Sequence, residues 1–225
     1  MIGNFVRNIL GMPSRTRFET SSKYWEDRYR SGGNSGIGSY GQFAEFKAEI
    51  LNQFVADHHI GSVIEFGCGD GNQLSLAKYP RYIGVDISPA AVEKCRERYR
   101  KDTSKTFLLI SEASNQRAEL ALSLDVIFHL VEDEVFQRYM TSLFAAAERH
   151  VVLYTSNFSG DKLDAANAHF SKAKHVRHRA VLEYITKEFH GWELKRHVPN
   201  RYPYNWQTSE GSFADFFFFE RLDGI

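Results

Sequence analysis

The sequence predicts an α/β fold with a doubly wound, mostly parallel sheet. Short apolar segments with strand character alternate with amphipathic segments along the chain, which is the order expected of such a sheet. The clearest unit is residues 63–86, where an apolar segment is followed by closely spaced glycines, a helical segment, and a second apolar segment that ends in an acid. This order of strand, glycine turn, helix, strand and acid is typical of the first half of a nucleotide-binding sheet.

Length and composition limit the class of protein. With 225 residues, we expect one domain over residues 43–225, preceded by a helix and a lid segment over residues 1–42. Basic and acidic residues balance at 28 each, which is not the composition of a DNA-binding protein. No apolar stretch approaches the roughly 20 residues that cross a bilayer. No signal peptide is evident, so we expect a cytoplasmic protein.

Cysteine usage agrees with a reducing compartment. Cys68 and Cys95 are the only cysteines, and their spacing predicts neither a disulfide framework nor a set of metal ligands. We therefore expect no metal ion in the functional site.

The first 18 residues have the pattern of a short amphipathic helix that ends at Gly11 and Pro13. Its apolar side chains fall on one helical face: Ile2, Phe5, Val6, Ile9 and Leu10. Two interpretations stay open, namely packing on the domain or on a partner, and weak attachment to a membrane surface helped by neighbouring arginines.

Residues 20–42 combine an aromatic and basic cluster with a glycine-rich loop that ends at Tyr40. A loop this rich in glycine is not a rigid core element. It is either a plain connector or a lid that closes over ligands, and we favour the lid. Within the cluster, Trp25 is predicted to pack against its neighbours.

The elements that follow alternate regularly. Residues 43–58 form an amphipathic helical pattern, 63–66 a buried strand, 72–78 a helix and 82–85 a second strand. Ser88 and Pro89 are the N-cap and first residue expected of a helix over 90–101. Residues 106–110 then read as a third strand.

The second half of the chain continues this order. Residues 119–124 are predicted as the fourth strand, 132–149 as a helix, 151–154 as the fifth strand, 181–190 as a helix and 192–198 as the sixth strand. Four successive phenylalanines within 213–221 predict a last strand that is covered on both faces.

The spacing of the glycines limits which class of nucleotide cofactor the segment is expected to bind. A dinucleotide fingerprint requires a glycine at position 72, where this chain has Asn72, so an NAD-dependent dehydrogenase is disfavoured. The pattern E-x-G-x-G-x-G resembles motif I of the class I S-adenosylmethionine-dependent methyltransferases, and it lies on Glu65, Gly67, Gly69 and Gly71.

The resemblance implies a fold and a set of cofactor contacts. It implies a three-layer α/β/α fold with seven strands, in which the last strand runs antiparallel between the fifth and the sixth. S-adenosyl-L-methionine is the implied cofactor. Asp86 matches the acid that binds both ribose hydroxyls, because a carboxylate can accept two hydrogen bonds at once. The other implied contacts are Ile87 beside this acid, Glu112 and Ala113 at the adenine, and Arg28 at the methionine carboxylate.

Asp125 and His129 are the candidate catalytic residues. They follow the fourth strand, at the edge of the sheet where ligands bind in such folds. The segment resembles a "D-V-x-x-H" turn that passes between cofactor and acceptor in this family. The ordinary pKa of histidine suits a general base, although a structural role for His129 stays open, and Asp125 can orient the acceptor or contact the cofactor.

A basic segment offers candidates for acceptor binding. Residues 172–179 end in HVRHR, at an insertion where this family builds its acceptor pocket, and a solvated surface is the competing interpretation. The candidate acceptor-binding residues are Tyr40, His175, Arg177, His178 and Arg179. Such donors suit an acceptor that carries phosphate, carboxylate or many hydroxyls.

The run SLDVIFHLVEDEVF and the basic HVRHR resemble bacterial methyltransferases found with polysaccharide and glycolipid genes. This resemblance implies transfer of a methyl group to the oxygen of a small polar acceptor, such as a sugar or phosphosugar. The alternatives are a methyltransferase acting on protein or RNA, and a non-catalytic S-adenosylmethionine-binding subunit that regulates a partner enzyme. The sequence predicts no oligomeric state.

Overall fold

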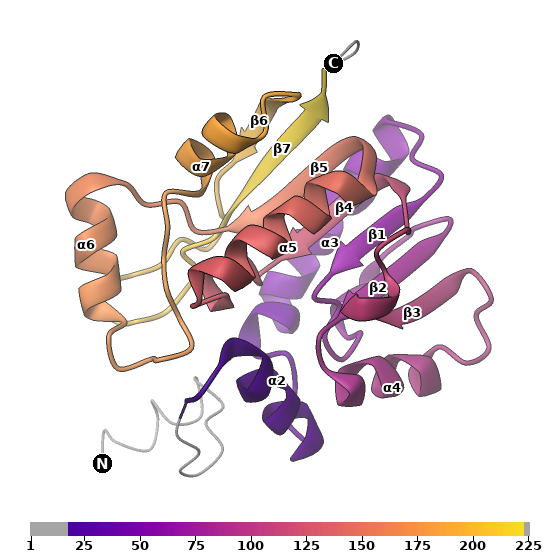
Figure 1. The fold of residues 1–225 in the computed structure, drawn as a ribbon, viewed down its shortest axis with the longest axis horizontal. Coiled ribbons are helices and arrows are strands. Elements are labelled where there is room, and N and C mark those ends of the chain that lie inside the picture. Colours follow the sequence, from indigo (N-terminus) through magenta and orange to yellow (C-terminus); the bar gives the residue numbers. More distant parts are fainter. Residues whose placement is uncertain (1–17, 223–225) are drawn as a thin grey trace.

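Seven strands form one sheet between two layers of helices in the computed structural model, which describes residues 18–222 (Figure 1). The helix predicted at the start of the chain lies outside the described residues. The strands are β1 (Val63–Phe66), β2 (Tyr82–Asp86), β3 (Lys105–Leu109), β4 (Ala118–Leu124), β5 (Ala147–Thr155), β6 (Trp192–Val198) and β7 (Asp215–Arg221). The α-helices are α2 (Ser21–Arg30), α3 (Gly41–Asp57), α4 (Pro89–Arg98), α5 (Asp133–Ala146), α6 (Gly160–His169) and α7 (Val181–Glu188). Short 3₁₀ turns are η1 (Ile37–Ser39), η2 (Gln73–Leu76), η3 (Ile110–Glu112) and η4 (Ile127–His129).

The sheet has the antiparallel last strand that the family resemblance implied. It runs β3-β2-β1-β4-β5-β7-β6, and β7 lies antiparallel between β5 and β6. The five strands β1 to β5 pair in parallel. The chain reverses its winding direction between β1 and β4, so the carboxyl ends of these two strands form the edge where a ligand is expected to bind.

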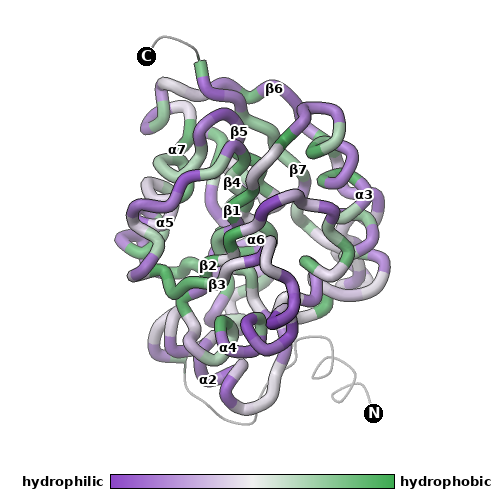
Figure 2. Tube along the Cα trace, turned by 90° about the vertical axis from the view of Figure 1, so that its right-hand side faces the viewer, coloured by the Kyte–Doolittle hydropathy of each residue, from purple (hydrophilic) through white to green (hydrophobic). Residues whose placement is uncertain are grey.

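The phenylalanines of β7 fill both sides of the sheet, as predicted. Phe216 and Phe218 belong to the core that contains α3 and α4, whereas Phe217 and Phe219 belong to the core that contains α5 and α7. Successive side chains of a strand point to opposite faces, so one apolar segment serves both layers. Figure 2 shows hydrophobic residues concentrated along the central strands.

The helix predicted over residues 72–78 is wrong. Only the turn η2 forms there, and Ala77 already has an extended backbone with ψ 145°. Pro80 follows closely and disfavours a helical conformation at the residue before it. Too few residues therefore remain between the glycine turn and β2 for a stable helix.

Other helices also differ from the prediction. Helix α5 ends at Ala146, and β5 begins at Ala147, because residues 147–149 join the sheet instead of extending the helix. The Ala118–Ala147 pair begins the parallel ladder between β4 and β5. Helices α2 and α6 occur in segments where the sequence predicted a lid cluster and a basic insertion without a helix.

Candidate functional site

A cavity of about 340 Å³ lies at the carboxyl ends of β1, β2 and β4, beneath α2. Its wall is mostly apolar, and several ionisable side chains reach it. Residues of the glycine turn, the end of β2, the end of β4, α2 and α5 line it together. Of the predicted site residues, those that line this cavity are Glu65, Gly67, Gly69, Asp86, Ile87, Asp125 and His129.

Gly67 and Gly69 give the turn after β1 its shape. Both have positive φ, 84° and 57°, which favours glycine. A Cβ at Gly67 would overlap the side chain of Val126, and a Cβ at Gly69 would overlap the hydroxyl of Ser35. The backbone therefore comes close to both the end of β4 and the lid loop. Gly71 does not line the cavity, and a Cβ there would lie 2.9 Å from the Tyr99 ring.

Asp86 is a buried carboxylate at the end of β2. Its Oδ2 accepts a hydrogen bond from the Gly69 N–H at 2.9 Å, and its Oδ1 accepts one from the Ser88 N–H at 2.9 Å. Burial raises the pKa of Asp86, while these backbone N–H groups partly offset the rise. Each carboxylate oxygen can accept a further hydrogen bond, so both can serve a ligand in the cavity.

Glu65 lies deeper, within β1. Its carboxylate accepts a hydrogen bond from the Tyr82 hydroxyl at 2.7 Å. Burial raises the pKa of Glu65 to about 7, and the hydrogen bond from Tyr82 and the charge of Lys47 oppose that rise. A cation bound nearby would favour the ionised form of Glu65.

Helix α2 and the loop after it lie over the cavity as a lid, here defined as residues 21–40. At one end, the Ser21 N–H and hydroxyl donate to the Glu132 carboxylate at 2.9 and 2.6 Å. In the middle, the Glu26 carboxylate accepts from the Ser88 hydroxyl at 2.5 Å. The lid is thereby attached to the starts of both α5 and α4.

The far end of the lid is attached to the glycine turn through Asp70. The Asp70 carboxylate accepts hydrogen bonds from the Ser35 N–H at 2.9 Å and the Tyr40 hydroxyl at 2.7 Å. Tyr40 was predicted to face the acceptor, but it does not line the cavity, and its hydroxyl serves this attachment.

Arg28 was predicted to meet the methionine carboxylate. Its side chain is only 5% exposed and does not line the cavity. Its Nε donates to the Asn34 carbonyl at 2.5 Å, so it shapes the lid loop from within. Trp25 does line the cavity, and its ring meets the His129 imidazole edge-on with centroids 4.9 Å apart.

His129 is the last residue of the turn η4, which begins shortly after Asp125. Its Nδ1 lies 2.9 Å from the carbonyl oxygen of His175, which can only accept, so Nδ1 carries the proton. The lone pair of Nε2 is then available to another group. Burial lowers the pKa of His129 to about 4, which keeps the imidazole neutral near pH 7.

Lys47 of α3 was missed by the sequence analysis. Its side chain is fully buried, and its Nζ donates to Asp125 Oδ2 at 2.6 Å. The signal was present, because Lys47 falls between Phe43 and Leu51 on the apolar face of its helix. A lysine on such a face is expected only where a partner is buried with it.

The basic segment does not line the cavity. Arg177 and Arg179 both pair with Asp133, at 2.9 and 3.0 Å, and both donate to the Val131 carbonyl. His178 is buried, and its Nδ1 lies 2.8 Å from the Ser156 hydroxyl. His175 stacks on Tyr24 with ring centroids 4.4 Å apart. Of these side chains, His175 contacts the lid, the two arginines bind the segment after β4 and the start of α5, and His178 binds the segment after β5.

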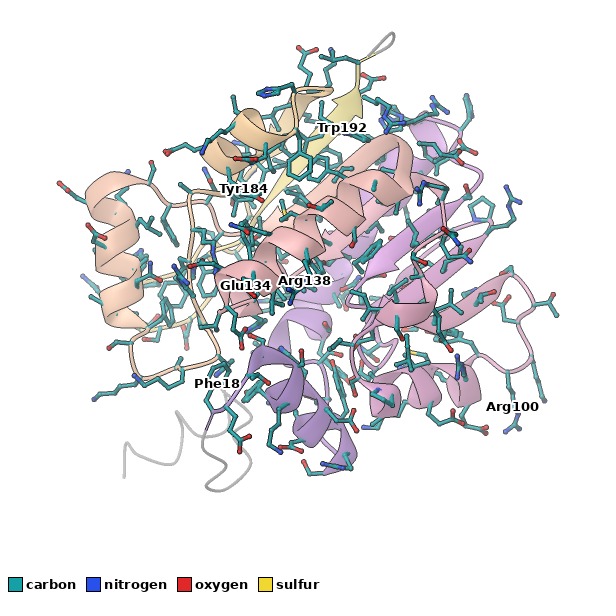
Figure 3. All side chains as sticks on the ribbon, viewed as in Figure 1. Phe18, Arg100, Glu134, Arg138, Tyr184 and Trp192 are labelled. Atoms are coloured by element: carbon teal, nitrogen blue, oxygen red, sulfur yellow. The ribbon has the colours of Figure 1, made fainter. Side chains whose placement is uncertain are left out.

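Glu112 and Ala113, predicted at the adenine, also lie away from the cavity wall. The Glu112 carboxylate accepts from the Leu109 N–H at 2.8 Å and lies 3.6 Å from Arg96. Ile110 lines the cavity instead. Arg138 of α5 also lines the cavity and lies 3.8 Å from Glu134, one turn earlier in the same helix (Figure 3).

Within residues 18–222, no three His, Cys, Asp or Glu side chains are grouped as metal ligands. None of the helices in that range has the length and apolar character that crossing a membrane requires.

The central part of the chain is similar to a known protein family. Residues 63–151 match a family model described as a methyltransferase domain. This range contains β1 to β4, the glycine turn, Asp86, Asp125 and His129. A search of curated proteins gives no significant match.

Solved structures share the fold over most of the chain. The N-methyltransferase NodS from Bradyrhizobium japonicum, in complex with S-adenosyl-l-homocysteine, is 13% identical with a TM-score of 0.67, covering 90% of this chain and 99% of that one. Magnesium protoporphyrin IX methyltransferase from Synechocystis, with bound S-adenosylmethionine, is 14% identical with a TM-score of 0.61, covering 92% and 100%. The methyltransferase domain of bacterial CtHen1-C is 20% identical with a TM-score of 0.59, covering 78% and 97%.

Proposed function

We propose, from the premise that the chain is a class I S-adenosylmethionine-dependent methyltransferase, that it methylates a hydroxyl oxygen of a small polar acceptor such as a sugar. The family match and the shared fold give the premise. The acceptor class and the roles of individual residues below are our proposal.

The cavity fits the cofactor. Gly67 and Gly69 leave the backbone free of side chains where the turn approaches the cavity, and Asp86 has lone pairs available for two hydroxyl groups. Ile87 and Ile110 supply apolar surface for a flat base. S-adenosylmethionine supplies a methyl group already activated by its sulfonium, so the protein mainly aligns the acceptor with it.

The observation that carries the proposal is the geometry of His129. A hydroxyl acceptor must lose its proton during methyl transfer. The bond from Nδ1–H to the His175 carbonyl fixes the tautomer, leaving Nε2 as a proton acceptor at the cavity wall. Because burial lowers the pKa of His129 to about 4, the imidazole is neutral at pH 7 but is a weaker base than an exposed histidine, so the proposed role rests on its tautomer and position. Such a proton acceptor suits an oxygen nucleophile, which must lose its proton, better than a nucleophile that needs no deprotonation.

The placement of charges favours a neutral acceptor over a phosphorylated one. The arginines proposed to bind phosphate are paired with Asp133 and with backbone carbonyls. The carboxylates that line the cavity are Glu65, Asp86 and Asp125. Of the cations that line it, Lys47 is paired with Asp125 and Arg138 with Glu134. A hydroxyl can donate to such a carboxylate, whereas a phosphate would be repelled by it.

Incubation with methyl-labelled S-adenosylmethionine tests the proposal. Parallel pools of neutral sugars and of sugar phosphates are offered, and mass spectrometry detects labelled products. We expect label in the neutral pool. His129→Asn should lower kcat by about 10²-fold or more, the typical contribution of a general base, with S-adenosylhomocysteine affinity within about twofold.

Two results would count against the proposal. Binding of the cofactor without label in either pool would exclude the acceptor class. Equal turnover by His129→Asn and by a control variant at the exposed His190 would exclude His129 as the base.

A further inference from the structure

Lys47 is a buried charge that packing alone does not explain. Its side chain is 0% exposed, its Nζ binds Asp125 Oδ2 at 2.6 Å, and the same Nζ lies 5.2 Å from the centre of the Tyr154 ring. Replacing a buried ion pair by apolar residues is often neutral or stabilising, so such a pair is weak evidence for a role in stability. Its position beside the cavity points to a role in the site.

Asp125 is held on one side and open on the other. It has a positive φ of 60°, unusual for a residue other than glycine, and its N–H donates to the Tyr154 carbonyl at 2.9 Å. Gly38 of the lid lies so close that a Cβ there would be 2.7 Å from Oδ2. Lys47 and the lid thus confine Oδ2. Among residues 18–222, no group donates a hydrogen bond to Oδ1, and the side chain is 19% exposed.

We propose that Lys47 is a positioning residue of the cofactor site. By binding Oδ2, it holds the Asp125 carboxylate so that Oδ1 can accept a hydrogen bond from the α-ammonium group of the methionine part of S-adenosylmethionine. A carboxylate accepts hydrogen bonds but donates none, so a cationic donor is its best partner.

Strand order places this contact at the amino-acid end of the cofactor. Asp86, at the end of β2, is assigned to the ribose, and β1 with its glycine turn lies between β2 and β4. Gly67 abuts Val126, the residue after Asp125. A cofactor that binds Asp86 and crosses the glycine turn therefore extends toward Asp125. Glu65 lines the cavity nearby, and an ammonium group bound there would favour its ionised form.

The experiment compares two ligands that differ only beyond the thioether. S-adenosylhomocysteine carries the amino-acid end, whereas 5′-methylthioadenosine lacks it. Calorimetry gives the affinity of each ligand for the wild type and for Lys47→Met, which keeps much of the side-chain volume without the charge. We expect the ratio of the two affinities to fall about fivefold or more in Lys47→Met, through weaker S-adenosylhomocysteine binding, with 5′-methylthioadenosine affinity within about twofold.

A double-mutant cycle shows whether Lys47 acts through Asp125. Asp125→Asn should lower the same ratio by about tenfold or more, and Lys47→Met should add little in the Asp125→Asn background. The double variant also removes both buried charges, which keeps the experiment informative if Lys47→Met folds poorly. Lys105→Met removes a mostly buried lysine that pairs with Asp102 away from the cavity; it is the matched control and should leave both affinities unchanged.

Three outcomes overturn the inference. In the first, Lys47→Met leaves the ratio of S-adenosylhomocysteine affinity to 5′-methylthioadenosine affinity unchanged or increases it. In the second, Lys47→Met weakens the binding of both ligands equally. In the third, the effects of Lys47→Met and Asp125→Asn are fully additive. The inference rests on the cofactor and not on the acceptor. A negative labelling experiment with sugars therefore refutes the proposed acceptor while leaving this test intact.

Discussion

The Asp86 carboxylate has several hydrogen-bond partners. It orients the glycine turn through the Gly69 N–H and the start of α4 through the Ser88 N–H, and it is assigned to the cofactor ribose. Asp86→Asn turns one acceptor oxygen into a donor, which then faces an N–H group or a hydroxyl. We expect S-adenosylhomocysteine binding to weaken by roughly 1.5–3 kcal/mol, the range for a hydrogen bond to a charged group.

Calorimetry checks this prediction with two ligands. 5′-Methylthioadenosine contains the same ribose, so its affinity should fall by a similar factor, unlike the pattern expected for Lys47→Met. Glu97→Gln, on the exposed side of α4, serves as the control. Unaltered affinity for both ligands would show that Asp86 does not bind the ribose.

His129 carries a prediction that needs no acceptor. Burial lowers its pKa to about 4, so its imidazole should stay neutral as the pH falls from 7.5 to 5, whereas an exposed histidine protonates near pH 6.5. NMR titration of the imidazole resonances, assigned with the His129→Asn variant, measures this directly. Titration of His129 near pH 6.5 would show that its environment is wetter than the structure indicates.

The sequence placed the polar residues at or just after strand ends better than those of the lid and of the basic segment. Glu65, Asp86, Asp125 and His129 all line the cavity, because motif spacing and strand ends determine where they lie. Arg28 does not, because it binds Asn34 within the lid, a contact that depends on how the loop folds. The burial of Lys47 beside Asp125 is likewise tertiary information, since the two residues are 78 positions apart.

At the scale of elements, the lid depends on its attachment to α5. The Ser21 hydroxyl donates to Glu132 at 2.6 Å and accepts from the Val131 N–H at 3.1 Å. Ser21→Ala removes both bonds at a buried position. We expect the free energy of opening of α2 to fall by about 1–2 kcal/mol. This corresponds to roughly 5–30-fold faster amide exchange in residues 21–30.

Hydrogen exchange followed by mass spectrometry tests the lid prediction. Lys23→Ala is the matched control on the same helix, because Lys23 makes only a surface pair with Asp27 and should change exchange little. Added S-adenosylhomocysteine should restore protection in Ser21→Ala if the lid closes on the cofactor. Identical exchange in Ser21→Ala and the wild type would mean that Glu132 does not hold the lid.

Elements with a strong apolar pattern were predicted well, and those that depend on distant partners were not. The predicted burial of Phe216–Phe219 on both faces is confirmed, and so is the position of β7 between β5 and β6 that the family resemblance implied. Helix α2 lies in a polar segment, and its N-cap Thr20 is a weak local signal. The helix expected over residues 72–78 fails because Pro80 and the glycine turn leave it too little length.

At the scale of the whole molecule, buried histidines make stability depend on pH. Burial lowers the pKa of His129 and His178 to about 4 and that of His175 to about 3. An unfolded histidine binds a proton near pH 6.5, so between about pH 6.5 and 4 the unfolded chain binds more protons at these positions. Their contribution to stability therefore decreases as the pH falls through this window.

Glu65 acts in the opposite direction. Its folded pKa of about 7 lies above its unfolded value, so it contributes stability below its unfolded pKa that is lost as the pH rises toward 7. One such acid offsets about one histidine. Burial also raises the pKa of Asp86 and lowers that of His150, so four histidines oppose two acids and determine the sign of the net change.

Urea unfolding at pH 7 and pH 5 tests this balance. We expect a lower free energy of unfolding at pH 5, with each of the three strongly shifted histidines contributing roughly 1–2 kcal/mol. His175→Phe keeps a ring stacked on Tyr24 but cannot be protonated, so it should recover about that much of the decrease. A control substitution at the exposed His190 should leave the decrease unchanged. His175→Phe should not show the full decrease in the free energy of unfolding between pH 7 and pH 5 if protonation of His175 contributes to it. A full decrease in this variant would show that protonation of His175 in its stack with Tyr24 does not cause the sensitivity to acid.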